Sequence, residues 1–296
     1  QGGAMPTGKR RWSAKCRIPQ THNPKLTNVQ PTILNENASM PESQITIPAI
    51  TTDQMREVDR LMVEAYGIEL LQMMENAGRH LAHLARRRFL EGDPRGTSVV
   101  VLAGTGGNGG GGLVAARRLH GWGASVRVVT TKAPAAYDGV PAHQLRILQN
   151  MDVPVTSATN DPALPEADLL LDALIGYSLS GEPRGAAARL IQAANDHPAP
   201  VLSLDVPSGL DATTGAVHTP AVRADATMTL ALPKDGLGAD PAAEAVGALF
   251  LADIGVPPSL YAEPTLGLDV GPLFAHTDLF SLTPIDDGRF RARPVQ

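Results

Sequence analysis

Apolar positions along the chain change their spacing near residue 95. Before that point, two segments carry an apolar residue every three or four positions, which is the spacing of one helix face, and Gly67 separates them. Thr52 is the expected N-cap of the first segment, and the run Arg86–Arg88 in the second is expected on a solvated face. The apolar positions are Met55, Val58, Leu61, Met62 and Ala65, followed by Leu70, Leu71, Met74, Ala77, Leu81 and Leu84. This pattern predicts two N-terminal helices.

After Asp93-Pro94, short apolar runs alternate with helical patterns. The runs are typical of strands buried on both faces. The expected strands are Ser98–Ala103, Ser125–Thr130, Ala167–Asp172, Val201–Asp205, Ala226–Leu232 and Ala248–Ala252, and the expected helices between them are Leu113–Leu119, His143–Asn150 and Gly185–Asn195. This alternation predicts an α/β fold that is doubly wound and Rossmann-like, with a mostly parallel sheet, right-handed crossovers and helices on both faces.

The ends of the chain lack such patterns. Residues 1–45 show no apolar period and are rich in Pro, Asn, Gln and Thr, so we predict a disordered tail, an α/β domain over 46–285 and a C-terminal tail over 286–296. The first 35 residues hold six cations and no acid. This basic segment is either an incidental tail or an organelle-targeting signal. We favour the former, with a cytoplasmic location, because the Ser-rich amphipathic pattern of a transit peptide is missing.

Charge and composition narrow the function. The formal net charge is −5, and from Glu36 onward the other 19 Lys and Arg residues accompany all 30 acids, which gives −11. An acidic body with 4 % aromatic residues disfavours direct nucleic-acid binding. No run of about 18 apolar residues occurs, so no membrane span is expected. Because Cys16 is the only cysteine, an intrachain disulfide and a Cys-rich metal site are excluded.

The segment Gly104–Gly112 contains seven glycines between a predicted strand and a predicted helix. Such a run has a large entropic cost, and its usual role is close backbone approach to an anion at a helix N-terminus; a flexible surface turn is the alternative. The first three glycines of a dinucleotide fingerprint are matched by Gly104, Gly106 and Gly109, and no Walker lysine follows. The next strand ends at Thr130 and leads into Thr131–Lys132 without the acid that holds a ribose, which argues against an ordinary dehydrogenase.

Two further strands end in an acid. Asp172 ends one strand, and Asp205 ends another before the turn Pro207-Ser208-Gly209. Either acid could be a simple turn or helix cap. However, ligands of this fold class bind at the carboxyl ends of parallel strands, so we expect both acids beside the glycine segment in one site.

These motifs occur in an order that resembles the NAD(P)H-hydrate epimerase family. The order is Met74-Glu75-Asn76-Ala77-Gly78, then the glycine segment running into Leu113–Arg117, Asp172-Ala173 with Gly176, Asp205–Asp211 and Leu232-Pro233-Lys234. The resemblance covers about Thr51 to Phe280. It implies an isomerase that interconverts the R and S hydrates of NADH and NADPH, in a stand-alone form coupled to a separate dehydratase, and it suggests a homodimer.

The resemblance also implies roles for individual residues. Potassium ligands would be Asn108, Asp172 and Ser208, a set of oxygen donors that suits a hard monovalent cation. Contacts to the hydrated cofactor would come from Gly107, Asn108, Gly109, Gly110, Gly111, Gly176, Tyr177, Ser178, Leu179, Ser180, Gly181, Glu182 and Asp205. Asp205 would be catalytic with help from Lys234, for which an exposed post-strand lysine is the alternative. Arg184 and Lys234 are candidate phosphate partners.

The epimerisation reaction would be helped by a carboxylate and an acid of this kind. Loss of hydroxide from carbon 6 of the hydrate leaves an iminium-like cation, and water can re-add from either face. A carboxylate near the developing charge and an acid that assists departure would accelerate this path.

The glycine segment departs from the family pattern at two positions: Gly107 replaces an Asn and Gly111 replaces an Asp. Losing a charged acceptor typically costs about 1–3 kcal/mol, which predicts roughly tenfold weaker binding. Two alternatives to an active epimerase therefore stay open. One is a catalytically weak or inactive nucleotide-binding or scaffold module on the same fold. The other, less favoured, is a dehydrogenase.

Overall fold

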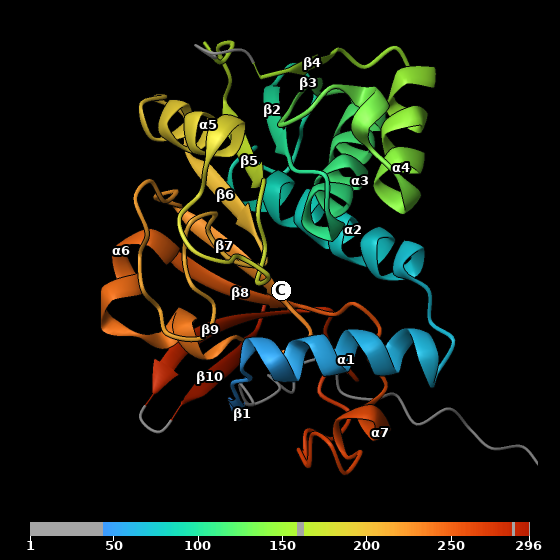
Figure 1. Cartoon of the computed structure of the whole chain (residues 1–296), viewed down its shortest axis with the longest axis vertical. Helices are drawn as coiled ribbons and strands as arrows, with labels where there is room; N and C mark the ends of the chain where they lie inside the picture. Colours follow the sequence, from blue (N-terminus) through green and yellow to red (C-terminus); the bar gives the residue numbers. More distant parts are fainter. Residues whose placement is uncertain (1–43, 159–162, 286–287, 296) are drawn as a thin grey trace, which may run out of the picture. The chain divides into compact units, whose positions relative to one another are not determined.

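The computed structural model of the chain (Figure 1) describes residues 44–158, 163–285 and 288–295, which belong to one unit, Pro41–Gln296. The strands are β1 (Ile45–Pro48), β2 (Ser98–Ala103), β3 (Ser125–Thr130), β4 (Val155–Ser157), β5 (Leu169–Ala173), β6 (Val201–Leu204), β7 (Ala226–Leu230), β8 (Ala248–Ala252), β9 (Leu279–Ile285) and β10 (Arg289–Pro294). The α-helices are α1 (Thr52–Glu64), α2 (Leu70–Arg88), α3 (Gly107–Gly121), α4 (Gly139–Asn150), α5 (Gly185–Asn195), α6 (Ala243–Val246) and α7 (Pro258–Tyr261). Short 3₁₀ turns cover Pro134–Ala136, Asp235–Gly238 and Asp240–Ala242.

All ten strands form one sheet in the order β1-β10-β9-β8-β7-β6-β5-β2-β3-β4. Strands β2 to β8 pair in parallel, and β8, β9, β10 and β1 pair antiparallel. The predicted mostly parallel sheet is therefore confirmed, with an antiparallel edge that the apolar pattern did not predict.

Helices cover both faces of the parallel part, as a doubly wound fold requires. Alternate residues of β2 show this directly. Val99 and Val101 pack in a core with α2, α3 and α4, whereas Val100 and Leu102 pack against α5. Because strand side chains alternate between faces, a run apolar at every position is buried on both sides.

The chain reverses its direction across the sheet beside β2. From β2 the chain passes through α3 to β3 and on to β4 at one edge, and then returns to β5 on the other side of β2. The carboxyl ends of β2 and β5 therefore form a topological switch point, where ligands of this fold class bind.

The two N-terminal helices are confirmed, with one correction at the first cap. Thr51, rather than Thr52, caps α1: its hydroxyl accepts from the Gln54 N–H, and the Gln54 side chain accepts from the Thr51 N–H. This reciprocal arrangement is a capping box. Helix α3 begins at Gly107 instead of near Leu113, so most of the glycine segment is helical.

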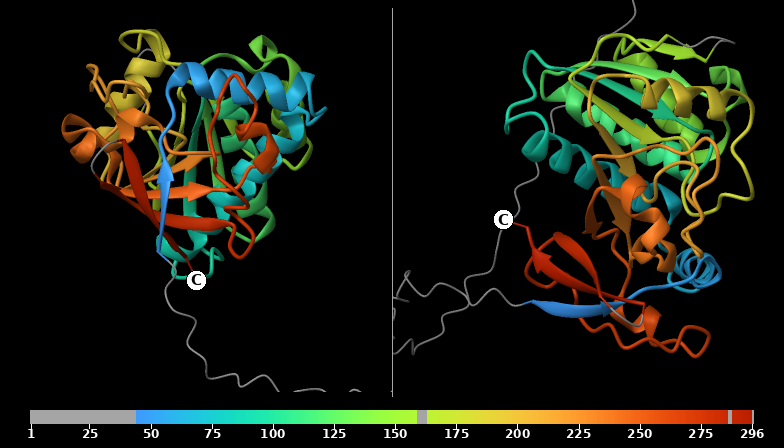
Figure 2. Two further views of the ribbon diagram at one scale, coloured as in Figure 1. Left: turned by 90° about the horizontal axis from the view of Figure 1, so that it is seen from below. Right: turned by 90° about the vertical axis from the view of Figure 1, so that its left-hand side faces the viewer.

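The predicted C-terminal tail over 286–296 is wrong for Arg289–Pro294. This segment is β10, which pairs with β9 on one side and with β1 on the other (Figure 2). The segment alternates between polar and apolar residues over only a few positions, so the sequence pattern did not predict that Phe290 and Ala292 are buried. Of the predicted N-terminal tail, residues 1–43 lie outside the described residues, and Ile45 already belongs to β1. No helix in the described ranges is long and apolar enough to cross a membrane.

Candidate functional site

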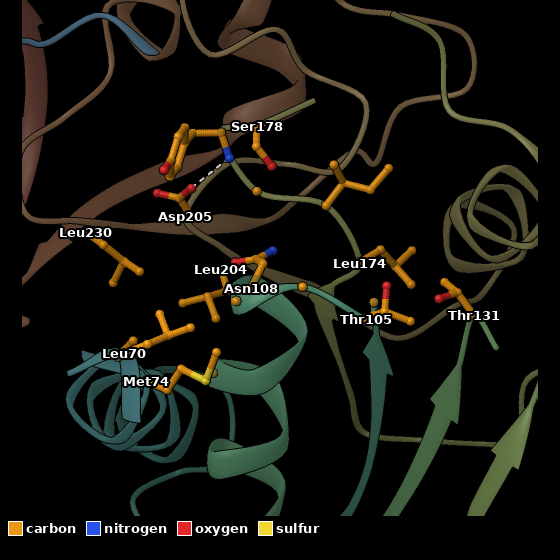
Figure 3. Close-up of a pocket in the computed structure, with 18 of the residues that line it drawn as sticks. Leu70, Met74, Thr105, Asn108, Thr131, Leu174, Ser178, Leu204, Asp205 and Leu230 are labelled. Atoms are coloured by element: carbon orange, nitrogen blue, oxygen red, sulfur yellow. Dashed lines mark hydrogen bonds between the residues drawn. The ribbon is translucent and has the colours of Figure 1, made fainter. Parts of the chain in front are cut away.

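A cavity of about 570 Å³ lies at the carboxyl ends of the central parallel strands (Figure 3). Its wall combines residues at or directly after the ends of β2, β3, β5, β6 and β7 with residues of α1, α2, α3 and α5. The apolar part of the wall includes Met55, Leu70, Met73, Met74, Ala77, Leu204, Leu230 and Ile254. The predicted meeting of the glycine segment with Asp205 is therefore observed at the switch point, whereas Asp172 is buried and is not part of the cavity wall.

The glycine segment allows α3 to start unusually close to its neighbours. A Cβ atom at Gly109 would overlap the carbonyl oxygen of Gly104, and one at Gly110 would overlap the Met74 sulfur. Gly104 itself lies against the Leu174 carbonyl. Only glycine fits positions where backbones approach this closely. The first N–H groups of α3, which have no partner within the helix, start beside the cavity and suit an anion.

Asn108 lies in the first turn of α3 and lines the cavity. Both polar atoms of its amide are buried and have no hydrogen-bond partner among the described residues. A buried amide without partners is costly, so this side chain is suited to a bound ligand or ion.

Asp172 is the second-last residue of β5, which is buried at every position, and Asp172 is fully buried itself. Its oxygens accept four hydrogen bonds: from the Ser208 Oγ at 2.6 Å, the Ser203 Oγ at 2.8 Å, the Ser208 N–H at 2.9 Å and the Leu174 N–H at 3.2 Å. Burial raises the pKa of Asp172, and these hydrogen bonds oppose that rise. No cationic side chain in the described part of the chain pairs with it.

The three predicted potassium ligands all carry oxygen donors, but only Asn108 lines the cavity, because Asp172 and Ser208 are buried outside its wall. Asn108 offers an unpartnered amide, Asp172 offers a carboxylate without a countercharge, and Ser208 offers a hydroxyl bonded to Asp172. Among the described residues there is no group of three or more His, Cys, Asp or Glu side chains that could hold a metal ion. The donor set therefore favours a hard monovalent cation over a transition metal.

Asp205 follows β6 with a positive φ of 70°, a conformation that is uncommon outside glycine and costs on the order of 1–3 kcal/mol. Its Oδ1 accepts from the Lys234 ammonium at 2.5 Å, and its Oδ2 accepts from the Tyr177 N–H at 2.8 Å. Asp205 lines the cavity, so a strained, doubly held carboxylate faces the ligand space.

Lys234 is 0 % exposed, so the alternative of an exposed lysine is wrong. Its ammonium donates to Asp205, to the Thr229 hydroxyl at 3.2 Å and to the Leu230 carbonyl at 2.9 Å. All three donors of the ammonium are thereby used. Lys234 is therefore not a phosphate partner, and it can act on a ligand only through Asp205.

The sequence analysis missed Asp59 of α1. The Tyr177 hydroxyl donates to the Asp59 Oδ2 at 2.5 Å, and both residues line the cavity. Burial raises the pKa of Asp59, and the nearby Asp205 charge adds to the rise. The position of Asp59 relative to the apolar residues of α1 could have indicated it. Asp59 lies four positions after Met55 and three before Met62, on the apolar face of α1, where an acid needs a partner.

Other predicted contact residues divide into two groups. Gly107, Asn108, Gly111, Gly176, Tyr177, Ser178 and Arg184 line the cavity, whereas Gly109, Gly110, Leu179, Ser180, Gly181 and Glu182 do not. Gly109 and Gly110 are covered by Gly104 and Met74, and Ser180 to Glu182 are exposed to solvent. For both groups, contact with a ligand stays a prediction.

The chain matches known proteins over most of its length. The family model described as "YjeF-related protein N-terminus" matches residues 70–236. The NAD(P)H-hydrate epimerase of Dehalogenimonas lykanthroporepellens is 45 % identical over 229 residues, which cover 76 % of this chain and 89 % of that protein. The bifunctional NAD(P)H-hydrate repair enzyme Nnr of Salinibacter ruber is 38 % identical over 237 residues, which cover 75 % of this chain and 43 % of that protein.

The fold also matches a solved structure. The crystal structure of the yeast protein ynu0 has a TM-score of 0.67 at 24 % sequence identity, and the match covers 80 % of this chain and 100 % of that one. At this identity, the likeness shows a shared fold.

Proposed function

This chain belongs to the family of YjeF-related protein N-termini, and we propose that it is an NAD(P)H-hydrate epimerase, an isomerase of damaged nicotinamide cofactors. The observation that carries the proposal is Asp205, which is bonded to the buried Lys234 ammonium and lines a cavity that also holds the N-terminus of α3. A carboxylate suits the cation formed at the ring, and a helix N-terminus suits the diphosphate of the same substrate.

The first task of the site is to hold the substrate across the switch point. The diphosphate lies at the first turn of α3, where Gly106 and Gly107 bring free N–H groups to the cavity. The hydrated ring lies at Asp205, beside Tyr177 and the apolar wall around Leu204. Because this wall carries few polar groups, it keeps water that is not needed for the reaction away from the ring.

The second task is the reversible loss of water. The bond between carbon 6 and the hydroxyl oxygen breaks, and the ring nitrogen supplies the electron pair of the new C=N bond. The departing hydroxide takes a proton and becomes water. Asp205 stabilises the cation, and the Lys234 ammonium at its Oδ1 is the source of a proton at that atom. Water then adds to the other face, and the proton returns.

The cation site completes the arrangement. Asn108, Asp172 and Ser208 would hold a potassium ion, which when bound would offset the Asp172 charge close to the substrate's diphosphate. The S hydrate that the reaction forms is the substrate of a dehydratase, so we propose that the chain works together with such an enzyme. The bifunctional repair enzyme of Salinibacter ruber supports this coupling.

The test is the epimerisation of purified R hydrate of NADH in potassium buffer, coupled to an S-specific dehydratase. We expect R hydrate to disappear faster than it does spontaneously, and the variant Asp205→Asn to lower this rate by at least about a hundredfold. Asn has the size of Asp, but it removes the charge and keeps only one of the two acceptor oxygens that the Lys234 ammonium and the Tyr177 N–H use.

The matched control is Asp269→Asn, which removes an exposed carboxylate outside the cavity wall. It is expected to react like the wild type. A folded wild-type protein that binds the hydrate without accelerating its epimerisation would instead support a binding module.

A further inference from the structure

Charges on the cavity wall are separated by sign. Four charged side chains line it: Asp59 and Asp205, which are linked through Tyr177, and Lys132 and Arg184. Lys132 follows β3, and Arg184 is the N-cap residue of α5. One part of the wall therefore suits a developing positive charge, and another suits phosphate groups.

Strand order gives the direction of the bound substrate. Asp205 follows β6 and Lys132 follows β3, and the sheet order between them is β6-β5-β2-β3. With strands about 4.8 Å apart, three steps separate these two strand ends by about 14 Å. Figure 3 shows Thr131 and Asp205 on opposite sides of Asn108. A dinucleotide whose ring lies at Asp205 and whose diphosphate lies at α3 therefore extends its second ribose towards the end of β3.

The backbone of Lys132 is held in place although its side chain is exposed. Its carbonyl oxygen accepts from the Thr130 hydroxyl at 2.7 Å and from the Ser157 hydroxyl at 3.3 Å. The Thr131 N–H donates to the Ala103 carbonyl of β2 at 3.1 Å. No carboxylate in the described part of the chain forms an ion pair with Lys132. A fixed backbone thus presents an ammonium that is available to a ligand.

We infer that Lys132, with Thr131 beside it, forms a subsite for a phosphate on the second ribose, so that the cavity prefers the hydrate of the 2′-phosphorylated cofactor. This position follows the second strand of the doubly wound fold, where an acid selects an unphosphorylated ribose and a cation accommodates a 2′-phosphate. Arg184 acts on the diphosphate common to both cofactors. The inference rests on the proposed function only for the direction of the substrate.

The test measures binding apart from catalysis, with NADP⁺ and NAD⁺ as probes in isothermal titration calorimetry of the full chain. We expect wild-type protein to bind NADP⁺ about tenfold more tightly than NAD⁺, because a charge-assisted contact to phosphate is gained. Lys132→Ala removes this difference by weakening NADP⁺ binding alone, and Lys132→Arg keeps it. Arg184→Ala weakens both complexes by similar factors.

The control for long-range charge is Arg127→Ala, which removes an exposed cation from β3, outside the cavity wall. We expect this variant to leave the ratio of the NAD⁺ and NADP⁺ dissociation constants unchanged. A ratio that is the same in Lys132→Ala and wild type overturns the inference, as does equal binding of the two probes by wild type.

The epimerisation rates of the two hydrates separate this result from the proposed function. A Lys132-dependent preference for NADP⁺ without acceleration of either hydrate contradicts the proposed function and supports the subsite. If epimerisation of both hydrates is accelerated and Lys132→Ala does not change the ratio of their kcat/KM values, the proposed function is supported and the subsite is contradicted.

Discussion

At the scale of single residues, the site is a chain of hydrogen bonds that joins α1 to the segments after β5, β6 and β7. Asp59 of α1 accepts from the Tyr177 hydroxyl, the Tyr177 N–H donates to Asp205, and Lys234 donates to the other oxygen of Asp205. The Lys234 ammonium also lies 6.0 Å from the centre of the Tyr177 ring. Because the two carboxylates share one neighbour, a change at Asp59 reaches Asp205 through the position of Tyr177.

Asp59 makes stability depend on pH. Burial raises its pKa in the folded protein above the usual 3.8, so the unfolded chain loses this proton first as the pH rises. The stabilisation that protonated Asp59 contributes is fully present below pH 3.8, and it is lost as the pH rises through the pKa of Asp59 in the folded protein. We therefore expect Asp59→Asn to raise the free energy of unfolding at pH 7, by about 1.4 kcal/mol for each pKa unit of the shift, and to have no such effect near pH 3.

Thermal unfolding between pH 3 and pH 8 checks this prediction. Asp53→Asn is the control, because Asp53 is exposed on the same helix. Asp59→Leu should destabilise the protein by about 1–3 kcal/mol, since the Tyr177 hydroxyl loses its acceptor. A pH-independent effect of Asp59→Asn would contradict the assignment.

Gly111, where the resembling family has an acid, also has a structural explanation. A Cβ atom there would lie 2.8 Å from the Leu204 Cδ2 and 3.7 Å from the Ala77 Cβ. A side chain at this position therefore competes with Leu204 for space, so the cavity wall beside α3 is apolar in this chain.

At the scale of elements, the start of α3 is shaped by packing more than by helix propensity. Its first six residues contain five glycines, which weaken a helix, yet the helix begins at Gly107. Gly111 and Gly112 would place a Cβ against Leu204 and Ala173, and Gly78 of α2 lies against Val114. Close contact of α3 with α2 and the sheet offsets the poor propensity.

Two glycine substitutions in α3 should therefore act in opposite directions. Gly109→Ala places a methyl group on the Gly104 carbonyl, where only backbone could move, so we expect a loss of about 3 kcal/mol or more. Gly121→Ala points into open space at the end of the helix and should stabilise by about 0.5 kcal/mol. Urea unfolding of both variants measures the difference, and equal effects would contradict close packing as the reason for the glycines.

At the scale of the whole molecule, the last strand joins the two ends of the described chain. Strand β10 lies between β1 and β9, and Phe290 packs in a core cluster with Ile47 of β1, Leu249 and Leu251 of β8, and Phe280. The C-terminal segment is therefore part of the sheet. The predicted homodimer is not decided by this arrangement and stays a prediction.

Two neighbours on β10 test this role. Phe290→Ala should lower the free energy of unfolding by about 3–5 kcal/mol, because it opens a cavity in that cluster. Arg291→Ala, on the exposed side of the strand, should change it by no more than about 0.5 kcal/mol. Urea unfolding would show equal, small effects if the segment were a loose tail.

The sequence by itself determined the parallel part of the sheet apart from β4, and it predicted that the glycine segment lies beside Asp205. A strand buried on both faces is apolar at every position, so Ser98–Ala103 was predicted with its observed bounds. The glycine segment, Asp172 and Asp205 were expected to meet because parallel strands end at the same edge of the sheet. These conclusions need only local patterns and one topological rule.

Tertiary structure alone decided the antiparallel edge, the burial of Lys234 and the role of Asp59. The alternating pattern of β10 is too short to separate a strand from a tail until β1 and β9 pair with it. Lys234 is buried because Asp205, Thr229 and the Leu230 carbonyl satisfy its ammonium. Asp59 and Tyr177 are 118 positions apart in the chain. Contacts between such distant residues follow from how the elements pack, which no local spacing encodes.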